Sequence, residues 1–191
     1  MKLKANNLIV MLFLVCFGVF AQEDTKDEVK DDSENLMTQV DNYKSKMLEK
    51  DPSLSSVLDD AQGYVIFPDI DEAGFVVGGS YGEGAVYENG VFIGTATLKQ
   101  LDIGLQAGFE SFAEIIVFKD QETLDAFKND KFEPSAELSA VVLDKGAAKS
   151  VTFDNGIAAF VMPKNGIMAD ASVGAQRFSF TKKTDTRVGD F

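Results

Sequence analysis

The sequence has no histidine, no tryptophan and one cysteine in 191 residues. Because histidine is the commonest general base and metal ligand, its absence excludes Ser–His–Asp and Cys–His catalysis, His-ligated zinc and haem with a proximal His. Basic residues are also scarce, with 18 Lys and Arg against 31 Asp and Glu and a net charge of −13. Salt-driven binding of nucleic acid needs clustered Lys and Arg, so no nucleic-acid partner is expected. With 45% hydrophobic residues, the chain still has enough apolar material for the core of one domain.

The N-terminus has the pattern of an export signal. Lys2 and Lys4 precede an uncharged apolar run over 8–20. This run is shorter than the roughly 20 residues of a transmembrane helix but has the length of a signal-peptide core. We expect cleavage after Ala21 and a periplasmic or secreted protein, peripheral on a membrane at most, with an uncleaved anchor as the alternative. Cys16 lies inside the apolar run without a lipoprotein box, so cleavage would leave a chain with no cysteine and no disulfide.

Composition divides the chain into four segments. Residues 1–21 form the predicted signal peptide, and the mostly acidic residues 22–33 are typical of a disordered tether. Apolar periodicity then runs through 34–183, which we predict to be a single domain. Residues 184–191 remain as a C-terminal tail.

Three helices are predicted from spacing and capping signals. One helix face is formed by Leu36, Val40, Tyr43 and Met47, which recur at helical intervals. Asp51-Pro52 should end this helix, because a residue before proline avoids the helical region. Ser53 is a candidate N-cap for a short second helix, and Asp120 can cap a third helix that places Leu124 and Phe127 on one face.

Most of the remaining sequence predicts strands. An apolar run over 64–67 ends at Pro68, and Asn89-Gly90 is a strong two-residue hairpin signal. The Asn-Gly pairs at 155–156 and 165–166 predict an antiparallel meander over 151–173, with a bulge near 174–176. The predicted fold is therefore α+β, mostly antiparallel β and barrel- or sandwich-like, with two N-terminal helices and one inserted helix.

Two local patterns invite a ligand but fail in detail. The glycine cluster at 78–84 lacks a phosphate-loop motif, so we interpret it as a place of tight backbone approach. Asp69 and Asp71 begin like a calcium loop, but position 12 is Ser80 where a bidentate Glu is needed, and a solvated turn is preferred. We expect no metal, no cofactor and no catalysis. The enzymatic alternative is a carboxylate-dependent hydrolase using Asp69, Asp71 and Glu114.

The first helix allows two interpretations. Its apolar face can pack on the sheet, or it can lie on a membrane, since Lys44, Lys46 and Lys50 stand near that face. Basic residues are scattered through the second half of the chain. A local patch of them could hold a lipid head group even in an acidic protein.

Seven segments in order resemble the SYLF lipid-binding domain family, and together they extend over residues 36–181. They are AQGYVIFP (61–68), AGFVVGGSYGEG (73–84), GLQAG (104–108), EIIVF (114–118), TLDAF (123–127), SAV (139–141) and GIMADASVGAQRF (166–178). The sequence is most similar to the exported bacterial branch. The position where family members often carry Asp is Ala113 here, with Glu114 next to it.

The resemblance implies a compact, mostly β domain with flanking helices that binds phospholipids. Eukaryotic members are associated with phosphoinositides, and some with actin, which an exported protein is not expected to meet. We therefore predict a non-catalytic phospholipid-binding module of the bacterial envelope. The candidate lipid-binding residues are Lys44, Lys46, Phe75, Tyr81, Lys164, Arg177 and Lys182. The alternative is a structural or stress-related envelope protein that binds a protein partner through its sheet or acidic tail.

Overall fold

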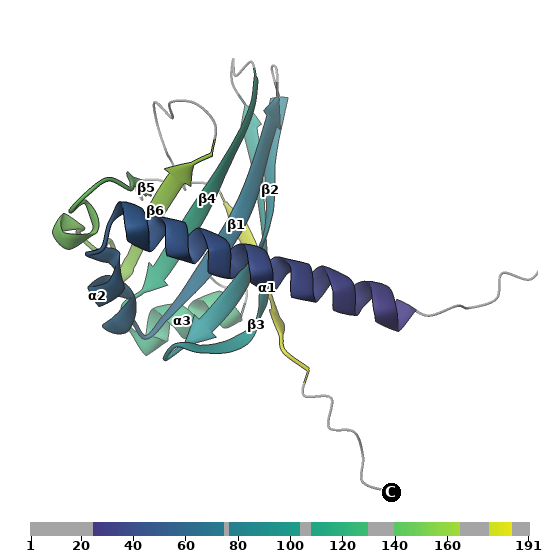
Figure 1. Ribbon diagram of the computed structural model, residues 1–191, viewed down its shortest axis with the longest axis horizontal. Helices are drawn as coiled ribbons and strands as arrows, with labels where there is room; N and C mark the ends of the chain where they lie inside the picture. The colour runs from purple at the N-terminus through teal and green to yellow at the C-terminus, as the bar shows by residue number, and fades with distance from the viewer. Residues whose placement is uncertain (1–24, 75–76, 104–107, 130–139, 165–175, 185–191) are drawn as a thin grey trace, which may run out of the picture.

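The computed structural model describes residues 25–74, 77–103, 108–129, 140–164 and 176–184 (Figure 1). In chain order the elements are α1 (Thr25–Lys50), α2 (Leu54–Asp59), β1 (Gly63–Gly74), β2 (Val77–Glu88), β3 (Val91–Ile103), β4 (Gly108–Phe118), α3 (Gln121–Lys128), β5 (Ala140–Val142), the 3-10 turn η1 (Ala148–Ser150), β6 (Ile157–Pro163) and β7 (Arg177–Lys182). The strands form one sheet in the order β5-β6-β4-β1-β2-β3-β7. Only the β5–β6 pair is parallel among the described strands. The predicted α+β class is confirmed, with two N-terminal helices and one inserted helix.

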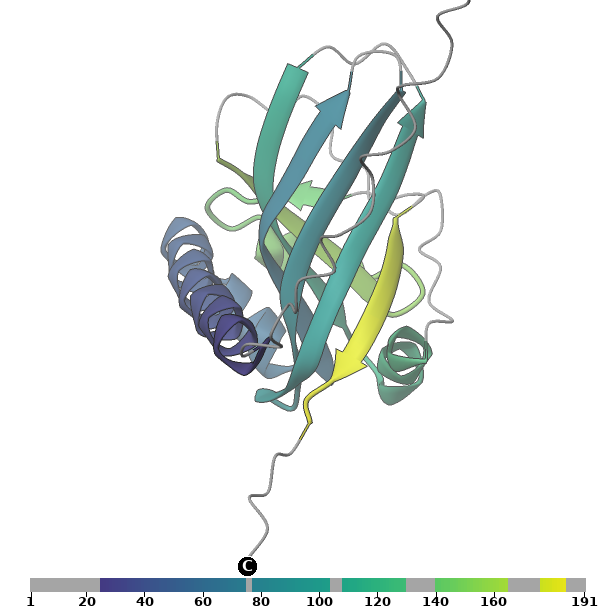
Figure 2. The ribbon, with the colours of Figure 1, turned by 90° about the vertical axis from the view of Figure 1, so that its right-hand side faces the viewer.

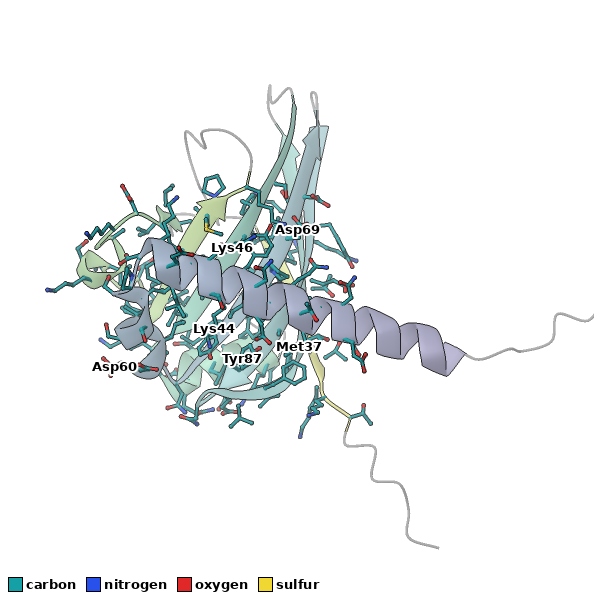
Figure 3. The ribbon with its side chains drawn as sticks, viewed as in Figure 1. Met37, Lys44, Lys46, Asp60, Asp69 and Tyr87 are labelled. Atoms are coloured by element: carbon teal, nitrogen blue, oxygen red, sulfur yellow. The ribbon has the colours of Figure 1, made fainter. Side chains whose placement is uncertain are left out.

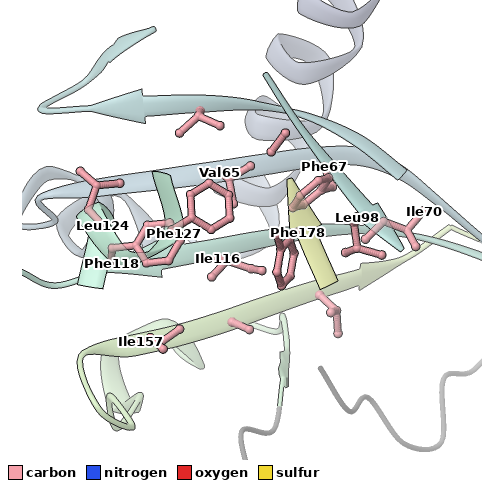
Figure 4. Close-up of a cluster of buried hydrophobic side chains, with 14 of the residues drawn as sticks. Val65, Phe67, Ile70, Leu98, Ile116, Phe118, Leu124, Phe127, Ile157 and Phe178 are labelled. Atoms are coloured by element: carbon pink, nitrogen blue, oxygen red, sulfur yellow. The ribbon is translucent and has the colours of Figure 1, made fainter. Parts of the chain in front are cut away.

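The sheet is twisted, and helices cover both of its faces (Figure 2). Strand parity therefore produces two apolar layers, because successive side chains point to opposite faces. The α1 face carries a cluster that includes Val40, Met47, Ile66, Ile115 and Phe160. The α3 face carries a second cluster that includes Val65, Phe67, Phe118, Phe127 and Phe178 (Figure 4). Each large apolar side chain buried in these layers contributes about 1.5–3 kcal/mol to folding.

Helix α1 packs on the sheet. Val40 and Met47 have no exposed surface, so the predicted apolar face is used internally rather than lying on a membrane. The helix ends at Lys50, as Asp51-Pro52 predicted. It begins at Thr25, inside the segment 22–33 predicted to be a disordered tether, and that prediction is corrected over 25–33.

Two local predictions differ from the structure: the helix cap at Ser53 and the end of a strand at Pro68. Ser53 precedes α2, but its side chain makes no cap and instead donates to Asp51 Oδ1 at 2.7 Å. Pro68 does not end β1, because the pairing of β1 with β2 and β4 shifts register around it. A bulge tolerates the missing N–H of proline within a strand. The segment after Pro68 therefore continues as strand rather than forming the predicted solvated turn.

The Asn-Gly signals are partly confirmed. Asn89 and Gly90 have positive φ angles of 49° and 75° and join β2 to β3. Asn155 and Gly156 also form a turn with positive φ, but residues 151–153 are not a strand. In place of the predicted meander, β6 pairs with β4 and β5. The third predicted strand and most of its bulge, over 165–175, lie outside the described residues.

The remaining local predictions concern the glycine cluster and α3. A Cβ on Gly82 would approach the Asp69 carbonyl oxygen to 2.9 Å, and one on Gly84 would approach the Ile66 carbonyl oxygen to 2.7 Å. This confirms close backbone approach, here in the middle of β2 beside β1. Asp120 caps α3 as predicted, accepting a bond from the Thr123 N–H at 2.9 Å.

Candidate functional site

Lys44 lies on one flank of α1, where two tyrosines of the sheet hold it. Its Nζ donates to Tyr64 Oη at 2.9 Å and stands 5.0 Å from the Tyr64 ring centroid and 5.6 Å from that of Tyr87. The two rings stack at 5.0 Å. Burial raises the pKa of Tyr87 to about 12, with the nearby Asp41 adding to the effect, so this tyrosine stays neutral. The half-buried ammonium is thereby fixed in position by cation–π contacts.

A pocket of about 390 Å³ opens beside Lys44. Its walls come from α1, from α2 and from the β2–β3 turn, and they include Leu48, Ser55, Asp59 and Asn89. Lys44 contributes a cation and Asp59 an anion, while Ser55 adds a hydroxyl and Asn89 an amide. This polar mixture suits a ligand with both donors and acceptors, such as the polar part of an amphiphile.

Lys46 and Lys164 meet at Tyr43 on the opposite flank of α1. Their Nζ atoms stand 4.6 and 4.4 Å from the Tyr43 ring centroid. Lys164 also forms an ion pair of 2.6 Å with Asp69 Oδ1, which accepts a 2.6 Å bond from Ser111 Oγ. We call these five residues the Tyr43 cluster. Figure 3 shows Lys46 and Asp69 on one side of the α1 axis, and Lys44 and Tyr87 on the other.

An exposed row crosses the sheet beyond the part that α1 covers. Tyr81 of β2 pairs with Lys99 of β3, which pairs with Arg177 of β7. Neighbours in register point to the same face, and the parity of Tyr81 with Ala85 and Tyr87 places the row on the α1 face. All three side chains are exposed, and Tyr81 is 49% exposed. Tyr81 Oη donates to Glu83 at 2.6 Å, a bond that raises the pKa of this tyrosine. We call Tyr81, Lys99 and Arg177 the basic row.

The structure thus gathers five of the seven candidate lipid-binding residues on one face, around α1 and along the basic row. Phe75 lies outside the described residues. Lys182 sits near the other end of β7, and its odd spacing from Arg177 gives it the opposite face. Lys99 was missed from sequence, because only the strand register that joins β2, β3 and β7 reveals its place between Tyr81 and Arg177.

The acidic residues of the described part of the chain were also compared with the rejected calcium loop and with other metal sites. No group of three Asp, Glu or Cys residues there is arranged to hold a metal ion. Asp69, the start of the rejected calcium loop, is instead paired with Lys164. Across the same residues, no helix has both the length and the apolar character needed to cross a membrane.

Sequence comparisons show which known proteins the chain is similar to. Residues 99–188 match the family model Ysc84, described as "Las17-binding protein actin regulator". The chain is also 24% identical over 154 residues to Beta cell expansion factor A of Aeromonas veronii, a match that covers 77% of this chain and 56% of the relative. The chain therefore spans little more than half the length of that curated relative.

The match supports a lipid- or actin-associated module. Both matches are similarities to proteins of the SYLF type. The predicted resemblance is confirmed. The family-model match begins at Lys99 and includes β4, β6 and the described part of β7, so Lys99, Lys164 and Arg177 all lie inside it.

Proposed function

We propose that the protein is a non-catalytic phospholipid-binding module of the bacterial envelope, and that it docks through its α1 face. The observation that carries this proposal is the convergence of the Tyr43 cluster and the basic row on one face of an acidic protein. They bring Lys46, Lys99, Lys164 and Arg177 to the same side of the sheet.

A phospholipid surface favours two kinds of side chain: cations near its phosphate groups, and rings that are partly polar at its interface. Lys and Arg near an anionic membrane surface contribute about 1 kcal/mol each. Tyrosine suits the interface because its ring is apolar and its hydroxyl is polar. Tyr81 and the partly buried Tyr43 provide such rings beside the cations. Together they allow moderate, salt-sensitive attachment to a lipid surface without a membrane-spanning element.

We also propose export, which is supported by the pattern of Lys2 and Lys4 before the apolar run and by the small residue Ala21. Expression in a bacterial host should yield a periplasmic or secreted protein whose N-terminal residue is Gln22. A mass that retains residues 1–21 would overturn this part of the proposal. It would leave the binding proposal intact, because the basic row lies far along the chain from this segment.

Vesicle co-sedimentation tests the binding proposal. The full chain should pellet with phosphatidylglycerol vesicles at low salt and much less with phosphatidylcholine. The double variant Lys99→Gln/Arg177→Gln should bind the anionic vesicles roughly thirtyfold more weakly, because two cations that contribute about 1 kcal/mol each are lost from the interface.

The matched control is Lys149→Gln/Lys182→Gln, which removes the same charge from η1 and from the other end of β7. It should bind like the unaltered chain. Equal losses in both double variants would show that only net charge matters and would overturn the assigned face. Failure of the unaltered chain to pellet with either vesicle would overturn lipid binding and favour the protein-partner hypothesis.

A further inference from the structure

Glu114 is a carboxylic acid placed inside the apolar layer of the α3 face. It lies in the middle of β4 between Phe67 of β1 and Val161 of β6, and it has no exposed surface. Its Oε2 accepts one long hydrogen bond of 3.3 Å from Gln176 Nε2. The other oxygen, Oε1, has no hydrogen-bond partner, and neither has Gln176 Oε1. An ionised carboxylate buried here would lose its hydrogen bonds from water without gaining equivalent bonds from the protein.

Among the residues that the structure describes, no cation on the surrounding elements compensates a charge on Glu114. Lys164, after β6, pairs with Asp69 of β1 on the α1 face. Lys128 of α3 pairs with Glu88 of β2 and with Asp125. The remaining basic residues on β3 and β7 are Lys99, Arg177 and Lys182, and they are exposed. Along β1 the acidic residue nearest to Phe67 is Asp69, and its carboxylate is paired with Lys164.

The contact between Glu114 and Gln176 joins parts of the sheet that are not neighbours. Strands β4 and β7 are separated by β1, β2 and β3 in the sheet order. Two residues after Gln176, the Phe178 ring packs 5.9 Å from Phe67 and 5.7 Å from Phe127. We call the contacts of Gln176 and Phe178 with Glu114, Phe67 and Phe127 the β7 seam.

We propose that Glu114 is a proton switch for the β7 seam: it is neutral while the seam is closed, and its ionisation at mildly alkaline pH opens the seam and exposes the apolar layer beneath. The neutral acid suits this place, because a protonated carboxyl carries no charge into an apolar layer that offers it a single hydrogen bond. Once the proton leaves to water, the carboxylate has one long bond from Gln176 and an oxygen, Oε1, without a donor, so its charge is not compensated while the seam is closed. Burial raises the pKa of Glu114 to about 8, partly offset by the Gln176 bond, which agrees with a switch in that range.

The composition of the chain makes this switch unusually easy to observe. With no histidine in the chain, no imidazole titrates between pH 6 and 9, the range that includes the raised pKa of Glu114. Every other titratable group remains in a Glu114 variant, so a comparison with Glu114→Gln isolates the contribution of Glu114. This inference concerns the core and does not depend on the proposed lipid function.

The test follows the fluorescence of an apolar-surface dye with the full chain between pH 6 and 9.5. Dye binding should rise several-fold with a midpoint near pH 8. Glu114→Gln keeps the shape but cannot ionise, so it should show no rise in this range. The matched control Glu122→Gln removes an exposed acid of α3 and should behave like the unaltered chain. A flat response of the unaltered chain, or an equal rise in Glu114→Gln, would overturn the proposal.

Infrared spectroscopy of the unaltered chain gives an independent readout that needs no variant to fold. At pH 6.5 exposed carboxyls are ionised, so a protonated-acid carbonyl band at this pH reports a buried neutral acid. The band should disappear together with the dye transition. Its absence at pH 6.5 would overturn the switch, whereas a band that persists above pH 9.5 would show that the acid is neutral but does not drive opening.

Discussion

Asp51 and Glu114 are both fully buried carboxyl groups, yet the fold treats them in opposite ways. Asp51 lies at the end of α1, where its two oxygens accept bonds of 2.7–3.0 Å from the N–H and Oγ of Ser53 and from the N–H groups of Gly146 and Ala148. Glu114, by contrast, has one bond of 3.3 Å and an oxygen without a partner. The difference teaches that donor supply, and not burial alone, decides whether a buried acid carries charge.

The two environments produce opposite dependences on pH. Burial raises the pKa of Asp51, but the bonds from Ala148, Ser53 and Gly146 outweigh it and the net pKa is lowered. The stabilisation from Asp51 is therefore present at neutral pH and is lost as pH falls below its usual value of about 3.8. Burial raises the pKa of Glu114 from 4.5 to about 8, so the folded state binds more protons than the unfolded state in that interval. Its effect on stability is a penalty that grows as pH rises from 4.5 to 8.

The largest expected effect comes from removing the satisfied acid. Asp51→Ala leaves the N–H groups of Gly146 and Ala148 buried without acceptors and releases the loop before η1. We expect the free energy of unfolding at pH 7 to fall by about 3–5 kcal/mol, measured by urea denaturation. The control Asp59→Ala, at an exposed position of α2, should change it by less than about 0.5 kcal/mol. A loss below about 1 kcal/mol for Asp51→Ala would contradict the assigned role.

Replacing the unsatisfied acid should have the opposite sign. In the double variant Glu114→Leu/Gln176→Leu, apolar groups replace a buried polar pair that lacks partners. We expect a gain of about 1–4 kcal/mol in the free energy of unfolding at pH 8.5, where the penalty of Glu114 is largest, and a smaller change at pH 5. Urea denaturation at both pH values checks this. An equal effect at the two pH values would mean that packing, and not the charge of Glu114, sets the difference.

The two acids also show where prediction from sequence succeeds and where it ends. The Asn89-Gly90 turn and the Asp120 cap depend on residues within a few positions, so spacing alone predicted them. Asp51 was predicted only as the end of a helix, because its partner Ala148 lies 97 residues away in sequence. Glu114 was noted beside Ala113 and as a carboxylate of the hydrolase alternative, but no local pattern places Gln176 against it.

The same limit applies to the candidate binding surface. Lys46 and Lys164 were candidates because they are basic, but the sequence did not show that both side chains lie against Tyr43. Lys99 carried no local signal at all, because its position between Tyr81 and Arg177 arises from the pairing of three strands. Sequence patterns therefore predicted the elements and the chemical character of the face. The constellation itself follows from long-range register, which a single sequence does not contain.

The smallest expected effect comes from weakening the one bond that Glu114 has. Gln176→Leu removes a donor that favours the charged carboxylate, so the pKa of Glu114 should rise above its value of about 8. A single hydrogen bond contributes about 1–1.5 kcal/mol, which corresponds to a shift of up to about one unit in the midpoint. The loss of the protonated-acid infrared band, followed against pH, measures this shift directly. A midpoint that moves down instead would mean that the Gln176 amide stabilises the neutral acid. In that case the two buried acids would differ in which protonation state their partners favour, and not only in how many donors they have.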